Sequence, residues 1–86
     1  MRCDDYNSGT IRHYAKVLHA DTLDVIASAN PPDDDRPDAT ITLIRLHTPE
    51  GPYYVIDTNG DPIIEDDDPE VWDEIIDSCE FRQYIL

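Results

Sequence analysis

The residues with the most conspicuous chemistry are the carboxylates of the C-terminal segment. The stretch "IIEDDDPEVWDEIIDSCEF", residues 63–81, holds nine aspartates and glutamates and no lysine or arginine. Two like charges about 6 Å apart repel by roughly 0.7 kcal/mol even in water, so this crowding opposes folding. Carboxylates in such a row can bind a divalent cation, transfer protons in catalysis, or pair with the arginines and lysines of a partner.

Calcium binding is the first of these possibilities. The stretch "DTNGDPIIEDDD", residues 57–68, spaces its oxygen side chains almost as an EF-hand loop does. However, its sixth position is Pro62 instead of the glycine that the sharp turn needs, and its twelfth is Asp68 instead of glutamate. Asn59-Gly60 as a hairpin turn explains the same residues more simply, so we expect no metal site.

Catalysis is the second possibility. Catalytic carboxylates need surroundings that push their pKa values apart, whereas Asp73 and Asp77 would be solvated on an open helix face. No serine sits in a nucleophile elbow, and the three histidines and two cysteines do not follow zinc-ligand spacing. We therefore expect a non-catalytic protein without a cofactor.

A predicted C-terminal helix positions the carboxylates. Asp68 is a suitable N-cap and Pro69 suits the first helical position, and we expect the helix to end near Glu80. At about 100° per residue, apolar and acidic side chains separate onto opposite arcs, so the outer face is predicted to be purely anionic. The apolar arc is Val71, Trp72, Ile75, Ile76 and Cys79. The acidic arc is Glu70, Asp73, Glu74, Asp77 and Glu80.

The rest of the chain predicts a sheet and a further helical segment. Residues 39–47, 52–58 and 61–65 have the composition of three antiparallel strands joined by tight turns. Residues 8–29 carry apolar side chains at spacings of three and four, which indicates one helix or two helices joined at a kink.

These elements predict an α+β fold in one domain, residues 1–86. Its parts are an N-terminal helical segment, a three-stranded antiparallel meander and the amphipathic acidic helix. Between the helical segment and the meander, "NPPDDDRPD", residues 30–38, is expected to be an exposed acidic loop. In the sheet, Tyr53 and Tyr54 must face opposite sides, so one of them packs under the helices.

The formal net charge of −14 excludes several classes of partner. Residues 46–81 contain twelve acids and no lysine or arginine, whereas residues 1–45 contain eight acids and five of the six cations. Such a field repels nucleic acid and anionic membranes, so direct binding to either is not expected.

The sequence has neither a secretory signal nor an apolar run long enough to span a bilayer, which predicts a cytoplasmic protein. Cys3 and Cys79 are then expected to be reduced, with a single disulfide between them left open.

An ordinary solvated surface explains only part of the acidic run. Negative charge beside a helix N-terminus is favourable by about 0.3–1 kcal/mol, which accounts for the residues before the helix. Asp77 and Glu80 lie at the C-terminal end, where the helix dipole prefers cations. A helix from Glu70 to Glu80 spans about 15 Å, the length of four or five phosphates of one nucleic-acid strand. The acidic arc of the predicted helix is therefore predicted to imitate a phosphate backbone.

The size, the acidity and the helix–meander–helix order resemble the small nucleic-acid-mimicking inhibitors encoded by phages and plasmids, above all anti-CRISPR proteins. The resemblance covers the composition and general plan of the whole chain. It implies inhibition of host defence through a basic nucleic-acid-binding protein, either a CRISPR effector subunit or a restriction enzyme. The predicted partner contact is Glu70, Asp73, Glu74, Asp77 and Glu80, supported by Asp66, Asp67 and Asp68. The secondary candidate contact is Asp33, Asp34, Asp35 and Asp38.

Two other interpretations stay open. Fifteen aspartates against one lysine also suit a halophilic cytoplasm, in which acidity serves solubility rather than a partner. An antitoxin-like interaction module would instead bind its partner through the apolar surface near Tyr53 or Tyr54.

Overall fold

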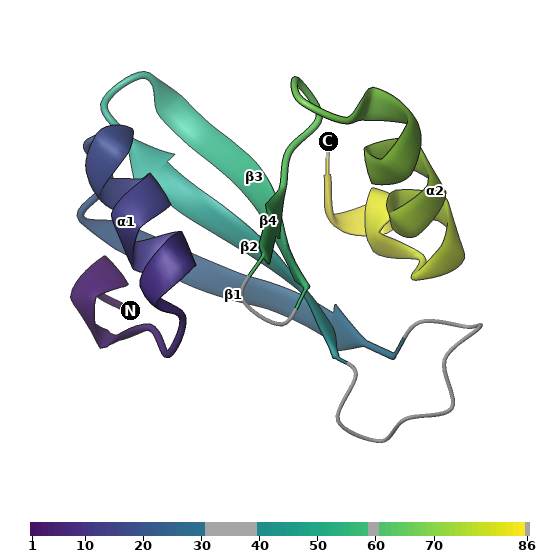
Figure 1. Ribbon diagram of the computed structural model, residues 1–86, viewed down its shortest axis with the longest axis horizontal. Coiled ribbons are helices and arrows are strands. Elements are labelled where there is room, and N and C mark those ends of the chain that lie inside the picture. Colours follow the sequence, from purple (N-terminus) through teal and green to yellow (C-terminus); the bar gives the residue numbers. More distant parts are fainter. Residues whose placement is uncertain (31–39, 59–60, 86) are drawn as a thin grey trace.

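Two α-helices and four strands account for most of the residues that the computed structural model describes, which are 1–30, 40–58 and 61–85 (Figure 1). The predicted α+β class is confirmed, with one antiparallel meander in the order β1-β2-β3-β4. The helices are α1 (Gly9–Val17) and α2 (Pro69–Ser78), with short 3₁₀ helices η1 (Cys3–Asp5) and η2 (Phe81–Tyr84). The strands are β1 (Thr22–Ala29), β2 (Ile41–Thr48), β3 (Gly51–Thr58) and β4 (Asp61–Ile63).

The N-terminal helix is shorter than the periodicity predicts. It begins after Ser8, whose hydroxyl accepts a hydrogen bond from the backbone N–H of Ile11 at 3.3 Å, as an N-cap does. It ends where His19 adopts the left-handed conformation, with φ of 60°. There the N–H of Ala20 donates to the carbonyl of Ala15 at 2.8 Å, which closes the Schellman motif.

The prediction of helix for residues 22–29 is wrong, because this segment is strand β1 and the meander has four strands instead of three. Strand β1 pairs with β2 along its length, but the register shifts between Val25 and Ala27. Such a bulge interrupts the alternation of a strand, so its apolar residues recur at spacings of three and four as they would in a helix. The sequence pattern alone therefore could not distinguish a bulged strand from helix in residues 22–29.

The two helices cover opposite faces of the sheet, as Figure 1 shows with α1 on one side of the strands and α2 on the other. Strand β2 contributes to both layers, since Ile44 and Leu46 pack toward α1 and Leu43 packs toward α2. Tyr53 packs with the α1 layer and Tyr54 with the α2 layer, which confirms that they face opposite sides, but both pack against a core where only one was expected to do so. A buried apolar core on each face holds the sheet between the helices.

The two cysteines are free thiols. Cys3 belongs to the core on the α1 side, whereas Cys79 packs against the core on the α2 side. The sheet separates the two side chains, so the disulfide that the sequence left open does not form. Burial raises the pKa of both thiols, which makes them poor nucleophiles.

Neither helix in the described part of the chain has the length and apolar character needed to cross a bilayer. The predicted acidic loop, residues 30–38, falls almost wholly outside the described residues.

A polar cluster on β1 and β2 gives a testable pH dependence. The Asp24 carboxylate lies 2.8 Å from His47 Nε2 and accepts a hydrogen bond from Arg45 Nη2 at 3.0 Å. Hydrogen bonds from His47 and then Arg45 lower the pKa of Asp24. Stabilisation from this carboxylate is therefore complete above the unfolded pKa of about 3.9 and is lost as the pH falls through the lower folded value.

In Asp24→Asn, we expect thermal unfolding midpoints below those of the natural chain at pH 7. That difference should shrink as the pH falls below about 4, and a constant difference would contradict the assignment.

Candidate acidic interface

Helix α2 holds Glu70, Asp73, Glu74 and Asp77 on a rigid support, whereas the fifth predicted primary residue, Glu80, lies beyond its end. Pro69 occupies the first turn and Asp68 is the N-cap residue, as predicted, although the Asp68 side chain makes no capping hydrogen bond. Trp72 and Ile76 are buried one helical turn apart and anchor α2 to the sheet. The helix stops at Ser78, close to the predicted end at Glu80.

The carboxylates of this region face solvent. All nine acidic residues between positions 65 and 80 are exposed. We call this set the acidic face: Glu65, Asp66, Asp67, Asp68, Glu70, Asp73, Glu74, Asp77 and Glu80. It contains the five predicted primary residues and the three supporting ones. The secondary candidates Asp33, Asp34, Asp35 and Asp38 lie outside the described residues.

The predicted apolar arc of α2 is narrower in the structure. Trp72 and Ile76 are buried, and Ile75 and Cys79 are partly buried, but Val71 keeps 42% of its surface exposed. A helix that rests on a sheet buries its central i, i+4 row most deeply, so residues at the border of the arc can remain in solvent. Val71 therefore adds an apolar contact beside Glu70 and Glu74.

The prediction of a purely anionic outer face is wrong, because Arg82 reaches back onto it. Its Nε lies 2.8 Å from Asp77 Oδ1, and its Nη2 lies 3.8 Å from Asp73 Oδ1. These exposed ion pairs contribute at most about 1 kcal/mol, but they lower the local negative charge. Among the described residues, no cation lies within ion-pair distance of Glu70 or Glu74.

The backbone reversal that brings Arg82 back depends on Glu80. Glu80 has φ of 59° and ψ of 33°, the left-handed conformation that glycine adopts without a steric penalty. Immediately after it, Phe81 inserts into the core on the α2 side. This turn folds η2 against the end of α2 and places Arg82 opposite Asp77.

Replacing Glu80 by glycine should therefore stabilise the domain. We expect Glu80→Gly to raise the free energy of unfolding by about 0.5–1 kcal/mol, because glycine accepts this conformation without strain. Urea unfolding followed by circular dichroism measures the change. Glu74→Gly is the matched control, since it removes a charge from the helix interior and should destabilise the domain by roughly 1 kcal/mol. Destabilisation by Glu80→Gly would contradict the turn geometry.

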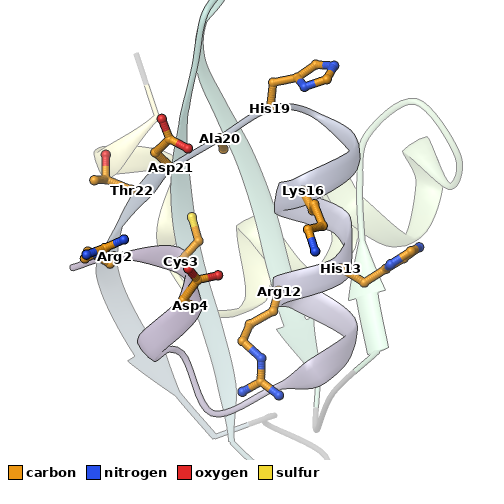
Figure 2. Close-up of a pocket in the computed structure, with 10 residues that line it drawn as sticks. All are labelled: Arg2, Cys3, Asp4, Arg12, His13, Lys16, His19, Ala20, Asp21 and Thr22. Atoms are coloured by element: carbon orange, nitrogen blue, oxygen red, sulfur yellow. The ribbon is translucent and has the colours of Figure 1, made fainter.

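A basic hollow lies on the other side of the sheet, between η1 and α1 (Figure 2). Arg2, Arg12 and Lys16 line it, together with Asp4 and Asp21. Within the described residues, no carboxylate lies close enough to form an ion pair with these three cations. Figure 2 shows Arg12 and Lys16 side by side along α1. Sequence reasoning missed this hollow, although their i, i+4 spacing and the concentration of cations in residues 1–45 were available signals.

Charge is therefore unevenly distributed: Arg2, Arg12 and Lys16 lie with Asp4 and Asp21 on the α1 side, whereas the carboxylates around α2 outnumber Arg82, the cation that pairs with them. Such a charge distribution orients a charged partner during diffusional approach. It favours encounters in which a basic surface meets α2.

The described residues contain no group of three or more histidine, cysteine, aspartate and glutamate side chains that could hold a metal ion. The arrangement can form charge-assisted hydrogen bonds to a cationic partner, and α2 fixes where those bonds form. No protein-family model, curated protein sequence or solved structure matches this chain.

Proposed function

We propose that this chain is a non-catalytic inhibitor that presents carboxylates in place of nucleic-acid phosphates and thereby occludes a basic nucleic-acid-binding surface. A CRISPR effector complex is the proposed target, and a restriction enzyme is the second target of the same kind. The observation that carries the proposal is the acidic face, whose nine carboxylates are all exposed. Only Asp73 and Asp77 among them form ion pairs with a described cation.

Rigidity is what distinguishes this face from a flexible acidic tail. Carboxylates on α2 advance by about 1.5 Å per residue and are held in place by the buried Trp72 and Ile76. A groove that grips phosphates with arginine and lysine can therefore meet several carboxylates without first ordering them, which avoids an entropic cost. Val71 adds a small apolar contact where a real phosphate backbone has none.

The nucleic-acid-like character predicts a steep dependence on salt. A basic groove that exchanges its counterions for four or five carboxylates loses affinity as ionic strength rises, as it does for DNA. Between 50 and 200 mM salt, the loss should be roughly 100-fold for about four contacts. An interface held by apolar burial would change much less.

Competition with DNA tests the proposal directly. Purified CRISPR effector complexes and restriction endonucleases are mixed with fluorescent target DNA, and its anisotropy is followed as the chain is added. We expect DNA to be released from at least one of these proteins at about one chain per binding site, with the salt dependence given above. DNA that stays bound to every tested protein under an excess of the chain would overturn the proposal.

Circular dichroism in dilute buffer and in molar potassium chloride separates this proposal from halophilic adaptation. An inhibitor of the proposed kind should be folded in both solutions. A halophilic protein should unfold in dilute buffer and regain its structure in high salt, because its excess charge then needs screening.

A further inference from the structure

A small hollow of about 230 Å³ lies beside the outer edge of β3, next to the beginning of α2. Its walls include Tyr53, Tyr54 and Trp72, and its rim carries Glu65 and Asp66. Binding sites for drug-sized ligands occupy about 300–1,000 Å³, so this hollow has the size for one side chain. We call it the aromatic hollow.

The aromatic walls are held in place by their surroundings. Trp72 is only 5% exposed and belongs to the core on the α2 side. The ring of Tyr53 is tilted against that of Tyr14 with centroids 6.2 Å apart, and its hydroxyl lies 3.4 Å from Asp66 Oδ2. The hollow is therefore largely formed before any ligand binds.

The edge of β3 adds backbone acceptors. Strand β4 pairs with residues 56–58 only, so the first part of β3 has no strand on its outer side. Thr48 and Gly51 flank a two-residue connection, which directs the odd-numbered residues of β3 toward β2 and the even-numbered ones outward. The carbonyl groups of Pro52 and Tyr54 thus point to the open edge, and proline contributes no N–H there.

These groups together select a cation with several hydrogen-bond donors. Two carboxylates and two outward carbonyl groups accept hydrogen bonds, and the aromatic side chains that line the hollow add a surface that attracts positive charge. A guanidinium group supplies five donors in a plane and stacks on aromatic rings, which an ammonium group does less well. The chain's own Arg45 does not line the hollow and is paired with Asp24, and no described cation forms an ion pair with Glu65 or Asp66.

We infer that the aromatic hollow binds an arginine side chain of the protein partner. The inference deepens the proposed function and rests on it for the basic character of that partner. The attraction of the α2 carboxylates for a basic surface acts over a distance and weakens as the salt concentration rises. The aromatic hollow instead removes water from a single arginine side chain at short range. An anchor of this kind gives specificity among basic surfaces that all attract the acidic face.

The first experiment uses the isolated chain and small probes. N-acetyl-arginine amide, its lysine counterpart and its citrulline counterpart are titrated in turn. Binding is followed by ¹⁵N–¹H chemical shifts and by the fluorescence of Trp72, the single tryptophan of the chain. Citrulline has the shape of arginine without its charge.

We expect saturable shifts around Tyr54 and Trp72 with the arginine probe, at a dissociation constant in the millimolar range that suits one side chain. The lysine probe should bind at least threefold more weakly and the citrulline probe at least tenfold more weakly. Citrulline that binds as tightly as arginine, or shifts that map elsewhere on the chain, would overturn the inference.

Charge removal supplies the second arm. Glu65→Gln with Asp66→Asn should raise the dissociation constant of the arginine probe at least fivefold. The matched pair Asp5→Asn with Asp61→Asn removes the same net charge at exposed positions away from the aromatic hollow, and it should leave that constant within twofold. Equal effects of the two pairs would mean that the probe senses only the general field, which contradicts a built site.

The inference and the proposed function can fail separately. If the arginine probe binds but no nucleic-acid-binding protein is inhibited, the aromatic hollow stands and the proposed function fails. If a target is inhibited equally by the natural chain and by Glu65→Gln with Asp66→Asn, the proposed function stands and the arginine anchor fails.

Discussion

Reversing Glu70 and Glu74 to lysine should weaken binding to the proposed basic target by at least 100-fold. Both residues are exposed, lie one helical turn apart on α2 and have no ion-pair partner among the described cations. Against a groove of arginines and lysines, the reversal replaces two attractions by two repulsions, each costing a few kcal/mol. Since about 1.4 kcal/mol corresponds to a factor of ten, 100-fold is a conservative expectation. Anisotropy competition with fluorescent DNA at low salt measures it.

Two controls separate position from total charge. Asp5→Lys with Asp61→Lys changes the net charge equally at exposed sites away from α2, so it should cost less than tenfold. Arg82→Gln should act in the opposite direction and tighten binding about threefold, because it releases Asp73 and Asp77 from their ion pairs. If the control pair costs as much as the α2 pair, binding follows net charge alone and the mimicry by α2 is wrong.

Truncating Phe81 should have the largest effect on stability. Its side chain is 2% exposed and packs in the core on the α2 side with Trp72 and Ile76. Phenylalanine-to-alanine changes in such cores cost about 3–5 kcal/mol, a large part of the total stability of a small domain. We therefore expect Phe81→Ala to shift the urea midpoint strongly and to leave the chain partly unfolded at 37 °C.

Tyr84→Ala is the matched control for that loss. Tyr84 lies in the same 3₁₀ helix but keeps 44% of its surface exposed, so its truncation should cost less than about 1 kcal/mol. Equal costs for the two variants would show that η2 contributes as a unit rather than through the burial of Phe81. The binding of the two folded variants can be compared only at a temperature where Phe81→Ala remains folded.

The patterns that sequence reasoning read correctly are local ones. Pro69 in the first turn of α2 and the opposite faces of Tyr53 and Tyr54 both follow from neighbours along the chain. The hairpin signals also predicted β2, β3 and β4 at nearly their observed positions. Helical and strand periods of 3.6 and 2 residues are properties of the backbone itself, so they can be read without knowing the fold.

The sequence predictions are wrong where a segment distant in sequence determines the local structure. Strand β1 appeared helical because its bulge breaks the alternation, and only pairing with β2 makes residues 22–29 a strand. Arg82 appeared remote from the acidic arc, yet the left-handed Glu80 returns it to Asp77. Neither the pairing of β1 nor the return of Arg82 produces a periodic pattern of side chains in the local sequence.

By itself, the sequence determined the concentration of negative charge and the placement of most of it on one arc of a C-terminal helix. The tertiary structure alone decided that α1 and α2 cover opposite faces and that Arg2, Arg12 and Lys16 line a hollow on the α1 side. It also placed Tyr53, Tyr54 and Trp72 beside Glu65 and Asp66. The physical reason is that charge and periodicity are carried by each residue and its near neighbours, whereas a hollow exists only where segments distant in sequence pack together.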